Sequence, residues 1–100
     1  MAIPEDDWQT AATDDLLASI LKLETHEEAA AFMRDLCTRK ELVEMSHRWE
    51  AVKLLDKGLP YREISERTGL STATITRINQ WLQHGTGGYR SMLTKSEEST

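Results

Sequence analysis

The chain has 100 residues, a length that suits one domain with one hydrophobic core and excludes a multidomain enzyme. Hydrophobic residues make up 39% and charged residues 29% of the chain, an ordinary globular balance that excludes wholesale disorder and a membrane span. The formal net charge of -5 divides unevenly, because residues 1–56 hold 6 basic and 13 acidic side chains, a net -7, whereas residues 57–90 hold 5 basic and 2 acidic side chains, a net +3.

The N-terminal residues 1–12 combine Pro4 and Trp8 with acidic and polar side chains and show no periodicity, so we expect a flexible arm. They lack the basic and apolar segments of a secretory signal, which favours a cytoplasmic protein. Cys37 is the single cysteine, so no intrachain disulfide can form. We expect no cofactor and no metal site, because His26, His47 and His84 are too far apart in the sequence for ligand spacing.

Three amphipathic helices are expected in the N-terminal half. The first begins with Thr13 as its N-cap and ends near Glu24. The second and third begin at capping boxes, Thr25 to Glu28 and Thr38 to Glu41, and Gly58 ends the third. The apolar positions that follow the helical period are Leu16, Leu17, Ile20, Leu21 and Leu23, then Ala29, Phe32, Met33 and Leu36, then Leu42, Met45, Trp49 and Val52. No segment alternates as a strand does, so the predicted fold class is all-α.

These apolar stripes are more extensive than a monomer of this length conveniently buries. We therefore expect two chains to share a core, with residues 13–57 forming the dimerisation helices of a homodimer. A compact monomeric bundle is the alternative.

A helix-turn-helix is predicted for residues 59–82. Pro60 suits the start of a short helix that Gly69 ends in left-handed geometry, and Ser71 caps the next helix. Because so few residues separate the two helices, they must meet at a steep angle. Ser65 is small enough for a close crossing, and the inward positions are Ile64, Leu70, Ile75 and Ile78.

The outward face of the second helix carries short hydroxyl side chains and one guanidinium, at Ser71, Thr72, Thr74, Thr76 and Arg77. Such side chains can bond base edges or phosphates at close range, and an arginine can pair with guanine or a phosphate through two hydrogen bonds. Arg62 at the start of the first helix is a candidate for a positioning contact with a phosphate. The pattern predicts a protein that binds double-stranded DNA through this local basic region. The alternative is a protein-interaction adaptor that docks the Thr-rich helix on another protein.

The segment from Gly85 to Gly88 is expected to end the second helix and lead into a short helix at 88–94, followed by a flexible tail at 95–100. The glycine run lacks the lysine and the preceding strand of a phosphate-binding loop. The carboxylates gather at helix starts, where caps and dipoles account for them, so no catalytic pair is evident and we do not expect an enzyme.

Several short motifs in residues 35–90 occur together in one family. They are Asp35-Leu36-Cys37-Thr38, Glu41-Leu42, Arg48-Trp49, Tyr61-Arg62-Glu63-Ile64, Thr68-Gly69, Ser71-Thr72-Ala73-Thr74-Ile75-Thr76-Arg77 and Gly87-Gly88-Tyr89. Through them the chain resembles the Trp-repressor-like superfamily, and in particular its YerC/YecD branch. The resemblance implies an intertwined, all-helical homodimer over residues 13–94 that carries two helix-turn-helix heads.

This resemblance also implies a function. We expect a bacterial transcriptional regulator, acting as a repressor at the nucleoid, that reads two symmetric half-sites about one helical turn apart. The residues expected to contact DNA are Tyr61, Arg62, Ser71, Thr72, Ala73, Thr74, Thr76 and Arg77.

The resemblance further indicates where an effector would bind. In the tryptophan-responsive members the amino acid lies between two arginines, beside small residues. The first arginine matches Arg77, and the second falls on His47, a weaker and pH-dependent cation. The small positions are Ile78 and Trp81, whose side chains would fill the ligand space. An effector pocket is therefore assigned to His47, Arg77 and Trp81, and tryptophan is not expected to bind there.

Overall fold

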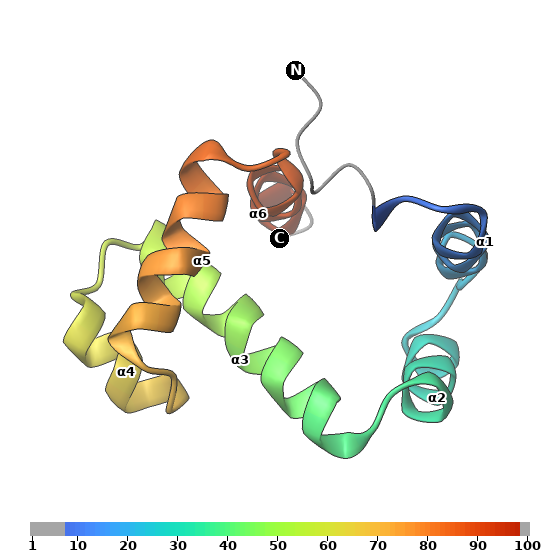
Figure 1. The fold of residues 1–100 in the computed structure, drawn as a ribbon, viewed down its shortest axis with the longest axis horizontal. Coiled ribbons are helices and arrows are strands. Elements are labelled where there is room, and N and C mark those ends of the chain that lie inside the picture. The colour runs from blue at the N-terminus through green and yellow to red at the C-terminus, as the bar shows by residue number, and fades with distance from the viewer. Residues whose placement is uncertain (1–7, 99–100) are drawn as a thin grey trace. The chain divides into compact units, whose positions relative to one another are not determined.

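A computed structural model describes residues 8–98, which form helices and no strand. The helices are α1 (Ala11–Ile20), α2 (His26–Leu36), α3 (Arg39–Asp56), α4 (Tyr61–Thr68), α5 (Thr72–His84) and α6 (Gly88–Glu98) (Figure 1). The predicted all-α class is confirmed. The chain divides into two compact units, and within the described residues the first holds α1 and α2 and the second holds α3 to α6.

The first helix begins earlier than the sequence pattern predicted. Thr10, not Thr13, is the N-cap, because its hydroxyl accepts a hydrogen bond from the Thr13 N–H at 3.2 Å. The Thr13 hydroxyl in turn accepts the Thr10 N–H at 2.6 Å, which completes a capping box. Ala11 and Ala12, both strong helix formers, are therefore helical rather than part of the expected arm at 1–12. Residues 1–7 of that arm lie outside the described residues.

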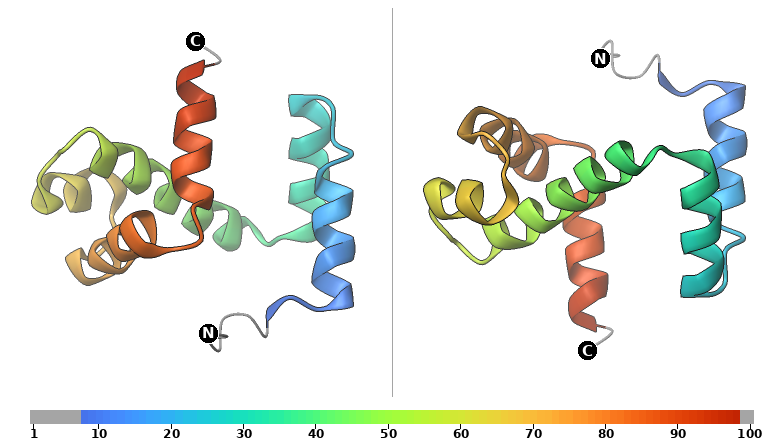
Figure 2. Two further views of the ribbon diagram at one scale, coloured as in Figure 1. Left: turned by 90° about the horizontal axis from the view of Figure 1, so that it is seen from above. Right: turned by 90° about the horizontal axis from the view of Figure 1, so that it is seen from below.

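The second helix starts at the predicted N-cap, Thr25, but the Glu28 carboxylate does not bond the N–H that a regular capping box uses. The Thr25 hydroxyl accepts the Glu28 N–H at 3.0 Å, as expected. The Glu28 carboxylate accepts the N–H of Glu24 at 2.8 Å, one residue before the position of a regular capping box. Within this unit α1 and α2 run in opposite directions (Figure 2). Neither helix contains a buried residue, and Leu21, which follows α1, is 85% exposed.

The core of the second unit lies where α4 and α5 pack against the C-terminal half of α3 (Figure 1). Its buried apolar residues are Ala51, Val52, Leu54, Ile64, Ile75, Ile78, Leu82 and Leu93. The apolar stripe of α3 continues toward its N-terminus, but Val43 and Met45 are exposed there. The part of α3 that this chain buries is therefore its C-terminal half, against which α4 and α5 pack.

Gly58 ends α3 with a Schellman motif, in which a left-handed residue lets two amides bond back to the last turn. Its φ is 83°, its N–H donates to the Leu55 carbonyl at 3.0 Å, and the Leu59 N–H donates to the Leu54 carbonyl at 3.2 Å. Leu59 packs against the core. The stop predicted at Gly58 is confirmed, and it directs the chain into α4.

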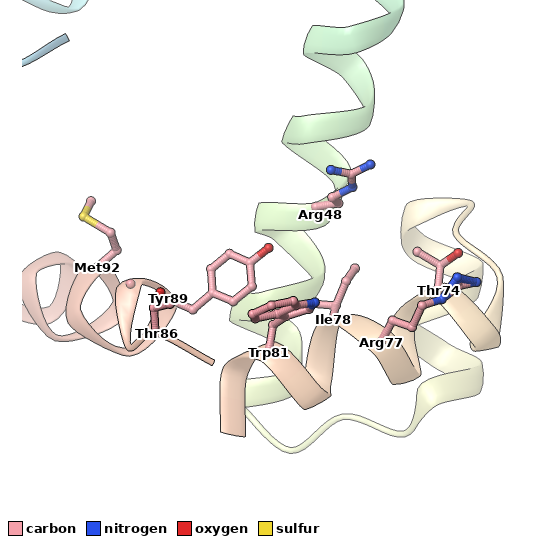
Figure 3. A pocket seen from close by; sticks show the side chains of 9 residues that line it. Arg48, Thr74, Arg77, Ile78, Trp81, Thr86, Tyr89 and Met92 are labelled. Carbon is pink, nitrogen blue, oxygen red and sulfur yellow. The ribbon is translucent and has the colours of Figure 1, made fainter. Parts of the chain in front are cut away.

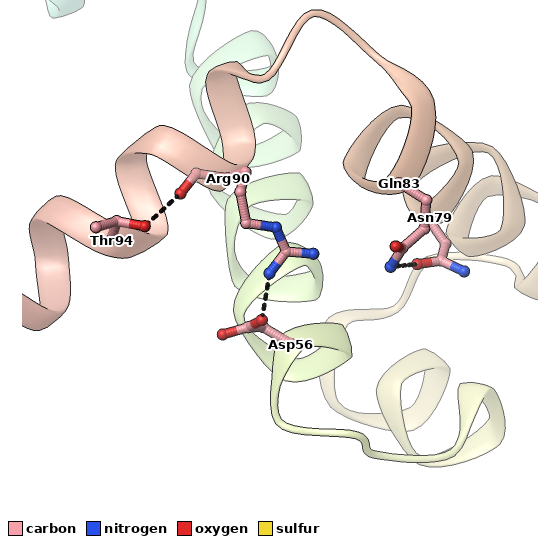
Figure 4. A network of polar contacts seen from close by, with 5 residues as sticks. All are labelled: Asp56, Asn79, Gln83, Arg90 and Thr94. Carbon is pink, nitrogen blue, oxygen red and sulfur yellow. Dashed lines mark hydrogen bonds and ion pairs between the residues drawn. The ribbon is translucent and has the colours of Figure 1, made fainter.

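The last helix is longer than expected. It runs from Gly88 to Glu98, so residues 95–98 are helical and not a flexible tail, because no glycine or proline follows Thr94 to end it. Residues 99–100 lie outside the described residues. Buried Leu93 anchors α6 to the core, and Arg90 Nη1 lies 2.8 Å from Asp56 Oδ1 at the end of α3 (Figure 4). Among residues 8–98 no helix has both the length and the apolar character to span a bilayer.

Candidate nucleic-acid interface

The corner between α4 and α5 is built from three turn residues. Gly69 has φ 79° and ψ 0°, a left-handed conformation that ends α4, and its N–H donates to the Ser65 carbonyl at 2.8 Å. After Leu70, the Ser71 hydroxyl caps α5 by accepting the Thr74 N–H at 3.1 Å. The predicted stop at Gly69 and the predicted cap at Ser71 are both confirmed. Local signals therefore determine where the chain turns in this corner.

Two hydroxyl groups hold the backbone of this turn from within. The Ser65 hydroxyl donates to the Leu70 carbonyl at 2.7 Å. The Thr68 hydroxyl, which is buried, donates to the Ile64 carbonyl at 2.8 Å and accepts the Leu70 N–H at 3.2 Å. The backbone N–H and the backbone carbonyl of Leu70 are thus both hydrogen-bonded within the protein, which favours one turn conformation. The sequence indicated a spacing role for Ser65 but gave no sign of the role of Thr68.

The apolar side of the corner agrees with the expected inward positions. Ile64 of α4 and Ile75 of α5 are completely buried, Ile78 is 4% exposed, and Leu70 packs against the same core from a half-buried position. These contacts fasten both helices to α3, so the outward face of α5 stands on a packed support.

The outward face of α5 is lined by hydroxyl groups. Thr72, Ala73, Thr76 and Arg77 are exposed and Thr74 is half-buried. The Ser71 hydroxyl donates to the Thr74 hydroxyl at 3.0 Å, and the Thr76 hydroxyl donates to the Thr72 carbonyl at 2.9 Å. Because these protons are held by the helix, the oxygen lone pairs of Thr76 and the methyl groups of the threonines remain available to a partner. Ser71, Thr72, Thr74 and Thr76 have short, uncharged side chains that can approach the floor of a groove.

The cations around the corner differ in how far they are neutralised. Arg62 Nε lies 3.9 Å from Glu66 with both side chains strongly exposed, a pair worth little in water, whereas Arg67 lies 2.7 Å from Glu63. Within residues 8–98, Arg77 makes no ion pair. The outward face of α5 therefore carries a guanidinium, that of Arg77, which no described carboxylate neutralises.

Tyr61, which we expect to contact DNA, makes a hydrogen bond within the protein. Its ring packs against the core, and its hydroxyl accepts a hydrogen bond from the side-chain amide of Asn79 at 2.8 Å. Tyr61 is half-buried, and this contact directs its polar end toward α5. Asn79 was not among the residues singled out from the sequence.

A pocket of about 700 Å³ opens between α3, α5 and α6 (Figure 3). It is lined by Arg48, Thr74, Arg77, Ile78, Trp81, Thr86, Gly88, Tyr89 and Met92. Arg77 and Trp81 line it and His47 is not among its lining residues, so the effector pocket assigned to His47, Arg77 and Trp81 stays a prediction. Arg48 lines the pocket from α3, because it lies four residues, about one helical turn, before buried Val52 and so shares its face of the helix. Counting back from Val52 would have found it from the sequence.

Comparison with known proteins identifies the family to which this fold belongs. The family model described as Trp repressor protein matches residues 11–97. The chain belongs to the Trp repressor family. The predicted resemblance is therefore confirmed for almost the whole described chain.

Three relatives place the chain more closely within the Trp repressor family. The YerC protein of Bacillus subtilis (strain 168) is 38% identical over 86 residues, which cover 86% of this chain and 83% of YerC. A solved structure of a TrpR-like protein from Eubacterium eligens has a TM-score of 0.87 and 37% identity, and the match covers 92% of this chain and 95% of the other. A candidate Trp repressor from Staphylococcus aureus has a TM-score of 0.88 and 35% identity, with 96% of each chain covered. The predicted Trp-repressor-like fold is thus confirmed.

Proposed function

We propose that this protein is a transcriptional regulator that binds double-stranded DNA with α5 in the major groove. The main support for this proposal is the exposed face of α5, which presents hydroxyl side chains and the unpaired Arg77. Ser65 and Thr68 hold the turn that leads into this helix. Hydroxyls and an arginine are suited to phosphates and base edges. Membership of the Trp repressor family supports the same function. The proposed role is repression at the nucleoid of a bacterial cytoplasm, without catalysis.

The proposed assembly is a homodimer. Neither α1 nor α2 contains a buried residue, although both carry an apolar stripe, and Leu21, Leu36 and Val43 are exposed. A second copy would bury these side chains in a shared core. Two corners related by a two-fold axis would then read half-sites about 34–36 Å apart, one turn of DNA.

We propose that DNA binding does not depend on tryptophan. The positions that are small in tryptophan-responsive members of the family hold Ile78 and Trp81 here, and both line the pocket beside Arg77. We expect their side chains to fill the part of this pocket, about 700 Å³ in all, that small residues would leave open to an indole. Arg77 is then free to act on DNA.

A protein-interaction adaptor remains the second candidate. Trp81 is 48% and Met92 is 51% exposed, and both line one pocket, so this side of the second unit offers apolar area to a protein partner. An adaptor of this kind would need no affinity for DNA, which separates the two functions.

A salt titration tests DNA binding. The affinity for a labelled random-sequence duplex, measured by fluorescence anisotropy, should fall steeply as salt rises, because bound cations release counterions from the phosphates. Arg77→Ala and Arg62→Ala should each reduce the slope of log K against log salt by about 1. Arg67→Ala, whose guanidinium already lies 2.7 Å from Glu63, is the matched control and should leave the slope unchanged. Absence of binding even at low salt would refute the proposal and favour the adaptor.

A further inference from the structure

We propose that the hydrogen bond between Tyr61 and Asn79 is an orientation lock that sets how α5 is presented to DNA and so determines sequence specificity. This inference rests on the DNA-binding function proposed above. It assigns Tyr61 and Asn79 as positioning residues that act through the outward face of α5, not as groups that touch DNA themselves.

The contact joins the start of α4 to the second half of α5. The Asn79 side-chain Nδ2 donates to the Tyr61 hydroxyl oxygen at 2.8 Å, across 18 residues of sequence, and both side chains are half-buried. The Tyr61 ring packs against the core, which holds the hydroxyl in place. Asn79 Oδ1 also accepts a longer, exposed hydrogen bond from Gln83 Nε2 at 3.3 Å within α5 (Figure 4).

Different contacts hold the two ends of the corner, the turn and the end where α4 begins. At the turn, Ser65 and Thr68 fix the backbone around Leu70. At the open end, where α4 begins, Tyr61 to Asn79 is the side-chain hydrogen bond that spans α4 and α5 within residues 8–98. The apolar contacts between the helices are non-directional, whereas a hydrogen bond specifies both distance and angle.

The size of the effect follows from helix geometry. The outer atoms of a helix lie about 5–6 Å from its axis, so a rotation of about 10° moves them by about 1 Å. Hydrogen bonds from side chains to base edges span only about 0.5 Å in length, from about 2.7 to 3.2 Å. Thr76 and Arg77 precede Asn79 by three and two residues on the same rigid helix, so a rotation released at Asn79 would take both out of register with the bases.

Phosphate contacts are less sensitive to such a rotation, because the attraction is long-ranged and independent of sequence. Loss of the lock should therefore weaken binding to the preferred sequence and leave binding to other sequences almost unchanged. A direct contact of Tyr61 with a phosphate would instead weaken both. The ratio of the two affinities thus distinguishes positioning from contact.

The experiment compares full-length wild-type protein with Tyr61→Phe, Asn79→Ala and the double variant. Two duplexes of equal length serve as probes, the one most enriched from a random pool by the wild-type protein and a scrambled version of it. Each single variant should lower the specificity ratio by about three- to tenfold, the range expected for one neutral hydrogen bond. The double variant should lose no more than either single variant, because the two changes remove the same interaction. Gln83→Ala, which leaves the Tyr61 contact in place, is the control and should keep the wild-type ratio.

The outcomes separate the alternatives. An unchanged ratio in Tyr61→Phe, equal weakening on both duplexes, or additive losses in the double variant would each overturn the lock. Thermal melting and circular dichroism of every variant identify any change that comes from unfolding, and Tyr61→Phe keeps the buried ring to prevent it. If the wild-type protein binds neither duplex, the proposed function itself fails, and the NMR signals of the Asn79 side-chain amide in Tyr61→Phe then report only whether the contact exists.

Discussion

The Thr68 hydroxyl accepts the N–H of Leu70 at 3.2 Å while it donates its own proton to the Ile64 carbonyl at 2.8 Å. One buried side chain therefore joins the last turn of α4 to the turn that leads into α5. Thr68 is 3% exposed, so water cannot replace either bond.

Thr68→Val should lower the free energy of unfolding by about 1–3 kcal/mol, because it leaves the Leu70 N–H without its partner. Thr76→Val is the matched control, since the Thr76 hydroxyl also donates to a carbonyl four residues earlier but is exposed, and it should cost less than about 0.5 kcal/mol. Urea denaturation at one fixed protein concentration measures both. Equal losses in the two variants would show that the buried hydroxyl has no special role.

Gly69→Ala should lower the free energy of unfolding by about 1–2 kcal/mol, the penalty of left-handed geometry for a residue with a Cβ. The φ of Gly69 is 79° and an added Cβ would meet no atom within 4 Å, so the loss would come from the backbone and not from a clash. Gly88→Ala is the comparison, because Gly88 also has open space but lies in α6 without a positive φ. It should leave stability unchanged or raise it by up to about 1 kcal/mol. A Gly69→Ala variant as stable as the wild type would contradict the described turn.

Leu21→Glu should convert a dimer to single chains. Leu21 is 85% exposed, so in an isolated chain the change would cost little, whereas in a shared core it would bury a carboxylate without a partner. Sedimentation equilibrium should show the wild type at twice 11.4 kDa and the variant nearer to 11.4 kDa. Lys22→Glu places the same carboxylate at the next position, with a net-charge change of −2 instead of −1, and should remain dimeric. A wild-type protein that sediments as one chain would refute the proposed assembly.

Tryptophan should not stabilise the protein. A ligand that binds only the folded state stabilises it by RT ln(1 + [L]/Kd) and so raises the melting temperature. We expect the melting curve to be the same with and without millimolar tryptophan, with glycine at the same concentration as the control for solute effects. A concentration-dependent rise with tryptophan, and none with glycine, would show that Ile78 and Trp81 leave room for the indole.

The sequence was most informative where a structure forms from neighbouring residues. The helix starts at Thr25 and Ser71 and the stops at Gly58 and Gly69 were predicted because caps and left-handed turns act within a few residues. The start of α1 was misplaced because Thr10 and Thr13 form one capping box and either threonine alone resembles a cap.

The sequence was less informative where tertiary packing decides the outcome. Arg48 was not assigned to the pocket, although it lies four residues before Val52, because the sequence alone does not show that this side of α3 faces the pocket. The contact between Tyr61 and Asn79 spans 18 residues and has no local signal.

The central claim is that the corner from α4 to α5 presents its hydroxyl-lined face to double-stranded DNA. Selection of bound duplexes from a random pool tests it most directly. We predict enrichment of a two-fold symmetric motif whose half-sites lie about 10 base pairs apart, and a changed or lost motif when Thr72 or Thr76 is replaced by alanine. A pool that shows no enrichment after repeated rounds, or the same motif with both threonines removed, would contradict it.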